Sequence, residues 1–180
     1  DVSTDDLETC CNENSCAALS FASGVVSDGS GGDGCTAGLV LTTNSDSSCS
    51  VKCDETTHVG QTATVTCAED ASSGQATTGQ PSCVARAECS SIACAEGWVA
   101  DPDAALTLCA GEECDASGAD NELCCNARAP CSEISCSAGW SADAGATSAL
   151  CIGSSCDVST DDLETCCNEN SCAAVSFGSG

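Results

Sequence analysis

The sequence has no methionine and no tyrosine, and only two tryptophans and two phenylalanines among its 180 residues. So few large apolar side chains leave little material for a hydrophobic core. No apolar run is long enough to span a membrane, and the N-terminus lacks the apolar core of a secretory signal peptide. The chain therefore needs another source of stability, and we interpret it as a mature or excised piece of a longer polypeptide.

Basic residues are also scarce: three lysines and arginines stand against 28 acidic residues, a net charge of −25. Nucleic acids and anionic membranes bind basic surfaces, so neither is expected as a partner. The single histidine, His58, supports no Ser–His–Asp or Cys–His arrangement, and no carboxylate pair stands out as an acid and base. We therefore expect no enzymatic activity.

Cysteine is the residue in excess, at 21 positions. Such a density is typical of a disulfide scaffold made in an oxidising compartment, which predicts an extracellular, secreted or cell-surface protein. A metal–thiolate protein is the weaker alternative, because the sequence has one histidine and no paired C-x-x-C motifs. Disulfides, each typically worth about 2–4 kcal/mol, are expected to replace apolar burial.

The sequence repeats itself. Residues 1–16 are identical to residues 157–172, so the period is 156 residues. The match continues to the C-terminus with two changes, Leu19 to Val175 and Ala22 to Gly178. Near-identity over so long a period indicates recent copying or selection for uniformity, and it predicts a window on a longer repetitive chain.

Two six-cysteine modules, offset by 42 residues, share the pattern C-x4-C-x2-G-W-x10-C-x4-C-x9-C-C. We name residues 89–130 module A and residues 131–171 module B. Residues 16–88 form a third six-cysteine module, while residues 1–15 and 172–180 are expected to end a preceding 42-residue module and to begin the next copy. Even numbers predict three disulfides within each module, although six cysteines allow fifteen connectivities. The predicted disulfide cysteines are Cys16, Cys35, Cys49, Cys53, Cys67, Cys83, Cys89, Cys94, Cys109, Cys114, Cys124, Cys125, Cys131, Cys136, Cys151, Cys156, Cys166 and Cys167.

Local patterns predict little regular structure. Consecutive Cα atoms are about 3.8 Å apart, shorter than the usual disulfide span, so Cys124 is not expected to pair with Cys125. Ser159 followed by acidic residues predicts an N-cap and one helical turn running into Cys166, and residues 62–66 alternate like a strand. The expected fold is a tandem of small disulfide-rich modules, mostly β and irregular, with single helical turns and little hydrophobic core.

The segment from Cys53 to Cys83 contains Gly60, the sequence Thr-Val-Thr-Cys ending at Cys67, and Pro-Ser-Cys ending at Cys83. It resembles the second half of a sushi, or complement control, module. It lacks the aromatic residue usual after the second cysteine and the tryptophan before the proline. The resemblance implies that Cys53 pairs with Cys83 and that Cys67 pairs with an earlier cysteine, Cys35.

Modules A and B carry Gly-Trp after the second cysteine and close on a Cys-Cys pair. In these features they resemble cysteine-rich tandem repeats in predicted extracellular proteins of unicellular algae such as dinoflagellates. The resemblance implies display outside the cell and attaches no chemistry to the motifs.

Trp98 and Trp140 occupy equivalent positions after a glycine, which predicts that each is the main apolar anchor of its module, packed on disulfides. The alternative is an exposed ring that stacks on sugar or on a neighbouring module.

The acidic segment after the fourth cysteine of module B spaces its oxygen ligands as a calcium ion could use them, at Asp157, Asp161, Asp162 and Glu164. It lacks the twelve-residue loop and central glycine of an EF-hand. Capping of the helical turn explains the same residues, and calcium is the only cofactor considered.

Serine and threonine are abundant, and a secreted chain of this kind is a candidate for O-linked glycans. No N-x-S/T sequon is present. The candidate positions are the threonine pairs Thr42, Thr43, Thr56, Thr57, Thr77 and Thr78.

Together these features predict a structural repeat of a secreted filament or surface coat, whose partner is itself, as a homopolymer or one continuous repeat chain, with covalently attached glycans as a further possibility. The main alternative is an adhesion or binding ectodomain that recognises protein or glycan. Binding proteins usually diversify their loops between copies, whereas the two ends of this sequence have hardly diverged.

Overall fold

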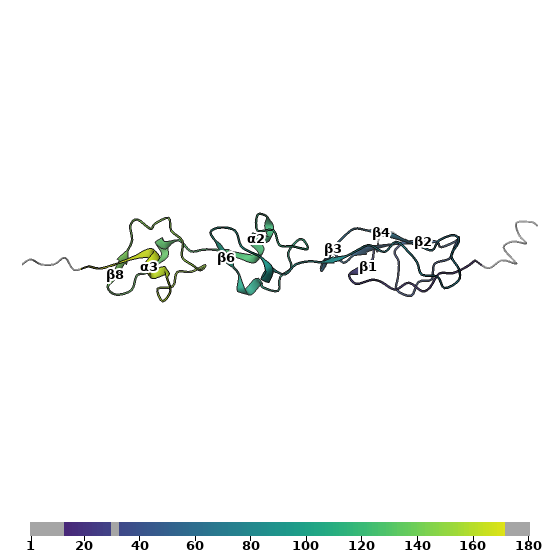
Figure 1. Cartoon of the computed structure of the whole chain (residues 1–180), viewed down its shortest axis with the longest axis horizontal. Coiled ribbons are helices and arrows are strands. Elements are labelled where there is room, and N and C mark those ends of the chain that lie inside the picture. Colours follow the sequence, from purple (N-terminus) through teal and green to yellow (C-terminus); the bar gives the residue numbers. More distant parts are fainter. Residues whose placement is uncertain (1–12, 30–32, 172–180) are drawn as a thin grey trace, which may run out of the picture. The chain divides into compact units, whose positions relative to one another are not determined.

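The computed structural model describes residues 13–29 and 33–171 and divides into two compact units, unit 1 (Asp1–Arg86) and unit 2 (Ala87–Gly180). The boundary lies two residues before the predicted start of module A, and modules A and B both belong to unit 2. In the described residues the strands are short, and the α-helices are two brief ones (Figure 1). The expected class, small disulfide-rich modules of strands and irregular chain, is confirmed.

Unit 1 contains a three-stranded antiparallel sheet in the order β1-β2-β4 and a separate two-stranded pairing of β3 with β5 (Figure 1). The bounds are β1 (Val25–Ser27), β2 (Ser48–Cys53), β3 (His58–Val59), β4 (Ala63–Thr66) and β5 (Val84–Ala85). Along β2, Cys49, Val51 and Cys53 are buried in alternation with more exposed residues, because successive side chains of a strand point to opposite faces. The strand predicted at residues 62–66 is confirmed as β4.

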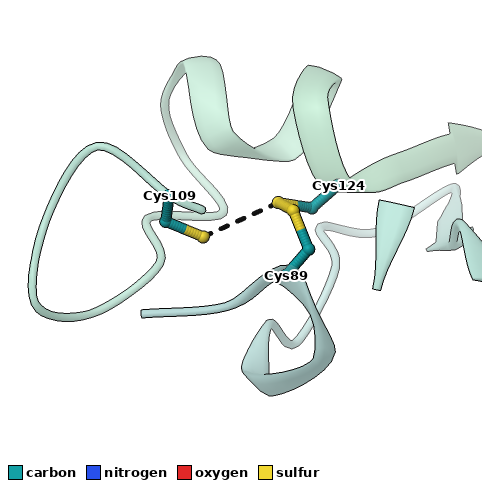
Figure 2. A group of neighbouring side chains, drawn as sticks. All are labelled: Cys89, Cys109 and Cys124. Atoms are coloured by element: carbon teal, nitrogen blue, oxygen red, sulfur yellow. Dashed lines mark hydrogen bonds between the residues drawn. A yellow bond between two sulfur atoms is a disulfide. The ribbon is translucent and has the colours of Figure 1, made fainter. Parts of the chain in front are cut away.

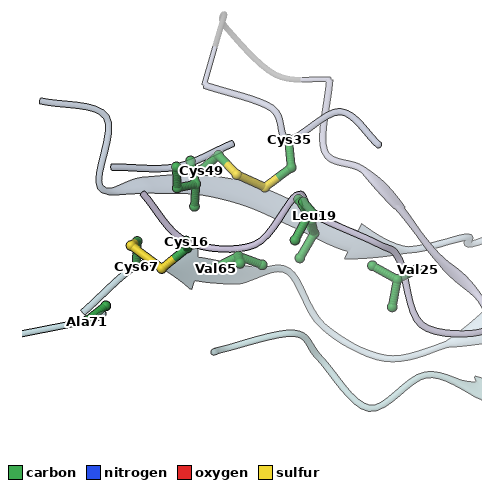
Figure 3. Close-up of a cluster of buried hydrophobic side chains, with 10 residues drawn as sticks. Cys16, Leu19, Val25, Cys35, Cys49, Val65, Cys67 and Ala71 are labelled. Atoms are coloured by element: carbon green, nitrogen blue, oxygen red, sulfur yellow. A yellow bond between two sulfur atoms is a disulfide. The ribbon is translucent and has the colours of Figure 1, made fainter. Parts of the chain in front are cut away.

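The core of unit 1 combines aliphatic side chains with two disulfides (Figure 3). Figure 3 shows the Cys16–Cys67 and Cys35–Cys49 bridges lying with Leu19, Val25 and Val65. The remaining aliphatic members are Leu41, Val51 and Ala71. Unit 1 therefore has a small conventional core that its disulfides extend.

Modules A and B repeat one arrangement of short elements, each with its own two-stranded antiparallel sheet. Module A contains η1 (Cys89–Ser91), β6 (Trp98–Ala100), η2 (Pro102–Ala104), α2 (Ala119–Cys124) and β7 (Cys125–Ala127). Module B contains η3 (Cys131–Glu133), β8 (Trp140–Ala142), α3 (Asp162–Cys166) and β9 (Cys167–Glu169). The helical turn predicted before Cys166 is present as α3, and α2 is its counterpart in module A. Because α3 begins at Asp162 after Asp161, the prediction of Ser159 as its N-cap is wrong.

The cores of modules A and B consist almost entirely of cysteine. The buried core of module A is Cys89, Cys109, Cys124 and Cys125. That of module B is Cys131, Cys151, Cys166 and Cys167, joined by Ala129 from the end of module A. Half-buried side chains, including the two tryptophans, pack around them. The shortage of buried aliphatic side chains expected from the composition is thus greatest in these two modules.

Nine disulfides join the eighteen predicted cysteines, and each closes within one predicted module. Cys53 pairs with Cys83, as the sushi resemblance implied. The other implied pairing is wrong: Cys67 bonds Cys16, while Cys35 bonds Cys49. The remaining cysteines, Cys10, Cys11 and Cys172, lie outside the described residues.

Candidate functional site: the disulfide knots and the module junction

The Cys-Cys pair that closes each 42-residue module grips two different parts of the chain. Cys124 ends α2 and bonds Cys89, whereas Cys125 begins β7 and bonds Cys94. Cys125 has extended backbone angles, and the change from helix to strand separates the directions of the two side chains. As predicted, neither adjacent pair is bonded to itself, because Cys166 and Cys167 likewise bond Cys131 and Cys136.

A second disulfide packs against this knot. In Figure 2 the Cys109 side chain points at the bridge between Cys89 and Cys124, and the Sγ atoms of Cys109 and Cys124 are 3.6 Å apart. Cys109 is itself bonded to Cys114. Module B repeats the contact with 3.6 Å between the sulfurs of Cys151 and Cys166.

The clustered sulfurs have the proximity of a metal site but not its chemistry. In each module three Sγ atoms lie within 4.8 Å of one another. A zinc ion is bound by thiolates, and every one of these sulfurs is part of a disulfide. The cluster is therefore a packed core, in which polarisable sulfur fills the place that aliphatic side chains fill elsewhere.

A buried aspartate organises the loop of each module. Asp162 is 1% exposed, and its two carboxylate oxygens accept hydrogen bonds from the N–H groups of Ile152 (2.6 Å) and Asp157 (3.0 Å). In module A, Asp120 accepts equivalent bonds at 2.9 and 3.0 Å from the N–H groups 42 residues earlier. Charge-assisted bonds of this kind compensate for the burial of a carboxylate and fix the loop that leads into the helix.

The predicted calcium ligands lie in this loop and hold the backbone in several ways. Asp157 is exposed, and the Ser159 hydroxyl and N–H both donate to its Oδ1, at 2.7 and 2.8 Å. The hydroxyl bond, followed by the N–H bond, lowers the pKa of Asp157 below its ordinary value. Asp161 and Glu164 are exposed. Both carboxylate oxygens of Asp162, by contrast, already accept hydrogen bonds from the backbone of the loop. Calcium binding at these four residues stays a prediction.

The two tryptophans begin equivalent strands. Trp98 lies in β6 and Trp140 in β8, each half-buried against the cysteine core of its module. The preceding residues, Gly97 and Gly139, have φ angles of +82° and +92°, which glycine adopts without steric cost. The Gly-Trp pair is therefore a turn followed by an apolar contact. Partial burial leaves both the anchor and the surface-stacking interpretations as predictions.

The threonine pairs predicted to carry glycans differ in their surroundings. Thr56 and Thr57 are exposed, and their hydroxyls donate to Asp54, which lowers the pKa of that carboxyl chiefly through the Thr56 hydroxyl. Thr78 is exposed, whereas Thr42 and Thr77 are half-buried. Thr43 is only 7% exposed, which argues against a glycan at that position.

The short link between modules A and B is hydrogen-bonded to both. The Arg128 N–H donates to the Gly97 carbonyl of module A (2.9 Å), while its guanidinium donates to the Cys151 and Leu150 carbonyls of module B. Ala129 is buried and pairs with module B through its own N–H, which donates to Gly153, and its carbonyl, which accepts from Cys151. Residues 126–130, between the last cysteine of module A and the first cysteine of module B, are thus held by both modules and do not form a free linker. The available signal was that the two arginines of the chain, Arg86 and Arg128, are 42 residues apart.

Comparison with known proteins gives no assignment: no protein-family model, no curated protein and no solved structure matches the chain. Among the residues that the structure describes, no helix is both long enough and apolar enough to cross a membrane. The nine disulfides are those of a disulfide-stabilised protein of the kind that folds in oxidising compartments.

Proposed function

We propose that the chain is a structural repeat unit, 156 residues in period, of a secreted extracellular filament or surface coat. The observation that carries the proposal is the near-identity of residues 1–24 and 157–180. Selection on a binding surface diversifies copies, whereas a polymer requires each copy to pack like the last. On this proposal the chain assembles with further copies of itself and has no catalytic role.

The disulfide chemistry supports a mechanical role. Each module closes three bridges of its own, so a local opening in one module does not have to spread to its neighbours. Proteolysis and shear act on opened chain, and cross-linked modules of this size open rarely because the unfolded state is restricted. Stability that does not depend on a large core suits a thin, highly exposed assembly.

The continuity of the module junction supports the same proposal. Arg128 bonds to both modules and Ala129 bonds to module B, so each residue from Arg128 to Cys131 makes a hydrogen bond. A filament that transmits load needs such connections, whereas a flexible tether suits a binding array. The charge of −25 adds repulsion that keeps neighbouring filaments apart at low ionic strength.

Electron microscopy of the native material tests the proposal. We expect unbranched filaments or an ordered coat whose mass per length corresponds to a constant number of repeats. Treatment with a reductant is expected to dissolve them, because both modules of unit 2 depend on disulfides. Discrete globular particles, or a chain found on cells only as a monomeric ectodomain, would overturn the filament and favour an adhesion role.

A further inference from the structure

The repeat places the same three residues in two different surroundings. Residues 169–171 (Glu-Asn-Ser) end the described part of unit 2, and residues 13–15, which begin the described part of unit 1, have the same sequence one period earlier. Residues 169–171 show the contacts that this segment makes with the module before it. Residues 13–15 show the contacts that it makes with the unit after it. Together they describe both sides of a junction.

The backward contacts belong to module B. Glu169 is the last residue of β9 and pairs with Trp140. The Asn170 N–H then donates to the Gly139 carbonyl at 2.8 Å. This bond is the counterpart of the one from Arg128 to Gly97, 42 residues earlier. Asn170 thus holds the position that Arg128 holds between modules A and B.

The forward contacts belong to unit 1. The Asn14 carbonyl accepts from the Thr43 N–H (3.0 Å), its Nδ2 donates to the Ala71 carbonyl (3.1 Å), and its Oδ1 accepts from the Ser73 hydroxyl (3.3 Å). The next carbonyl, of Ser15, accepts from Gly74 (2.7 Å). These bonds use the carbonyl and the side-chain amide of asparagine and leave its N–H for the backward bond. One asparagine can therefore make both sets at once.

The spacing of the cysteines explains why one residue has to do this. Five residues separate Cys125 from Cys131, but four separate Cys167 from Cys172. In the longer link two residues make these main-chain bonds: the Arg128 N–H donates to the preceding module, and the Ala129 carbonyl accepts from Cys151 of the following module (2.8 Å). In the shorter link the backward donor and the forward acceptor fall on the same residue. The asparagine side chain supplies the extra forward bonds that the guanidinium supplies at Arg128.

We propose that Asn170 is the docking residue for a second copy of unit 1, which it holds through the contacts that Asn14 makes, with no free linker residue between the two. The inference rests on the proposed function, since it requires the chain to continue into another repeat. It adds that Asn170 positions the next unit directly on module B.

The test uses the full chain extended at Gly180 by residues 25–86 of its own sequence, which supplies a second copy of unit 1. Nuclear magnetic resonance then compares Asn14 and Asn170 in one molecule. We expect the Asn170 side-chain amide to exchange with solvent as slowly as that of Asn14, and faster in the unextended chain. Exchange as fast as in the unextended chain would overturn the proposal.

A matched pair of substitutions separates the role of this side chain from a general effect on β9. Asn170→Ala in the extended chain keeps the main-chain acceptor of the added Thr43 amide but removes the side-chain bonds to the added Ala71 and Ser73. The weaker docking contact should open more often and speed exchange of the added Thr43 amide on the order of five- to tenfold. Asn168→Ala, at an exposed position two residues earlier, should leave it unchanged. Equal rates in the two variants would contradict the docking role, and an unchanged disulfide map confirms that both have folded.

The two proposals fail separately. Slow exchange at Asn170 together with native material that forms no filaments would retain the docking contact and overturn the filament. Filaments together with fast exchange at Asn170 would retain the proposed function and show that repeats are joined in another way.

Discussion

Unit 1 and the modules of unit 2 differ in the side chains that form their buried cores. Four aliphatic residues of unit 1, Leu19, Leu41, Val51 and Val65, are at most 4% exposed. In modules A and B the buried apolar side chains are cysteines apart from Ala129. A chain of about 42 residues buries too little surface to fold on apolar contacts alone, so the cross-links carry the core. Disulfides therefore add to an aliphatic core in unit 1, whereas in modules A and B they form almost the whole core.

The strongest test of this difference removes one bridge from each kind of core. Replacing Cys131 and Cys166 together by serine deletes the knot of module B and should cost about 2–5 kcal/mol, enough to unfold that module at ordinary temperature. Trp140 reports on module B alone when Trp98 is replaced by phenylalanine. Its fluorescence during guanidinium titration measures the loss.

The matched change in unit 1 is the replacement of Cys35 and Cys49 by serine. This bridge closes a shorter loop, with a sequence separation of 14 against 35, and the aliphatic core remains. Unit 1 should stay folded but have a lower free energy of unfolding, which amide hydrogen exchange in β2 measures. Equal loss of structure in both units would break the comparison.

The complementary test removes an aliphatic side chain. Leu41 is 1% exposed, and Leu41→Ala should destabilise unit 1 by about 2–5 kcal/mol through lost burial and the cavity that remains. Hydrogen exchange in β2 and β4 measures the effect, while the tryptophan signals of modules A and B should not change. Leu106→Ala is the control, because Leu106 is 82% exposed and should change stability by less than about 0.5 kcal/mol.

A smaller effect is expected from the buried aspartate, which belongs to the 42-residue modules. Asp162→Ala leaves the Ile152 and Asp157 N–H groups without their acceptor, at a cost of about 1 kcal/mol for each of these part-buried hydrogen bonds. Exchange of those two amides should accelerate. Asp161→Ala, at the neighbouring exposed position, should have little effect, and an equal effect would show that the loop is not organised by Asp162.

The smallest expected effect is the loss of stability at low pH. The pKa of Asp157 is lowered by Ser159, and that of Asp115 is lowered by Ser117 in the same way. A carboxyl whose folded pKa is depressed contributes stability above its unfolded pKa of about 3.9 and loses that contribution as the pH falls through the folded value. Ser159→Ala should raise the pKa of Asp157 toward its ordinary value in a carboxyl NMR titration and leave Asp115 unchanged. An unshifted Asp157 would show that the hydroxyl does not control its titration.

The cysteine spacing was sufficient to predict much of this architecture, because even groups of six identify modules and the short Cα distance disfavours a bond between adjacent cysteines. The pairing of Cys35 was not predictable. It depends on which Cα atoms the sheet brings within bonding range, and Cys35 lies 5.1 Å from Cys49. The sushi resemblance supplied one pair correctly and the other wrongly, since Cys16 takes the partner that the resemblance gave to Cys35.

The buried aspartates show a second limit. Asp120 and Asp162 recur at the 42-residue offset, yet an acidic residue in an acidic loop reads locally as a solvated cap or a calcium ligand. Only the fold reveals that the Asp162 carboxylate turns inward onto two N–H groups. The same holds for Arg128, whose guanidinium bonds to carbonyls of the following module in a chain with few other cations.

Peptide mapping of the native material tests most directly whether this chain is one period of a continuous repeat. Trypsin has three cleavage sites in the sequence, after Lys52, Arg86 and Arg128. After reduction and alkylation, a continuous repeat should yield the peptides 53–86 and 87–128 together with an equimolar peptide that starts at Ala129 and runs through the next copy to the equivalent of Lys52. Absence of that spanning peptide, or its presence in only a small proportion of chains, would contradict the account.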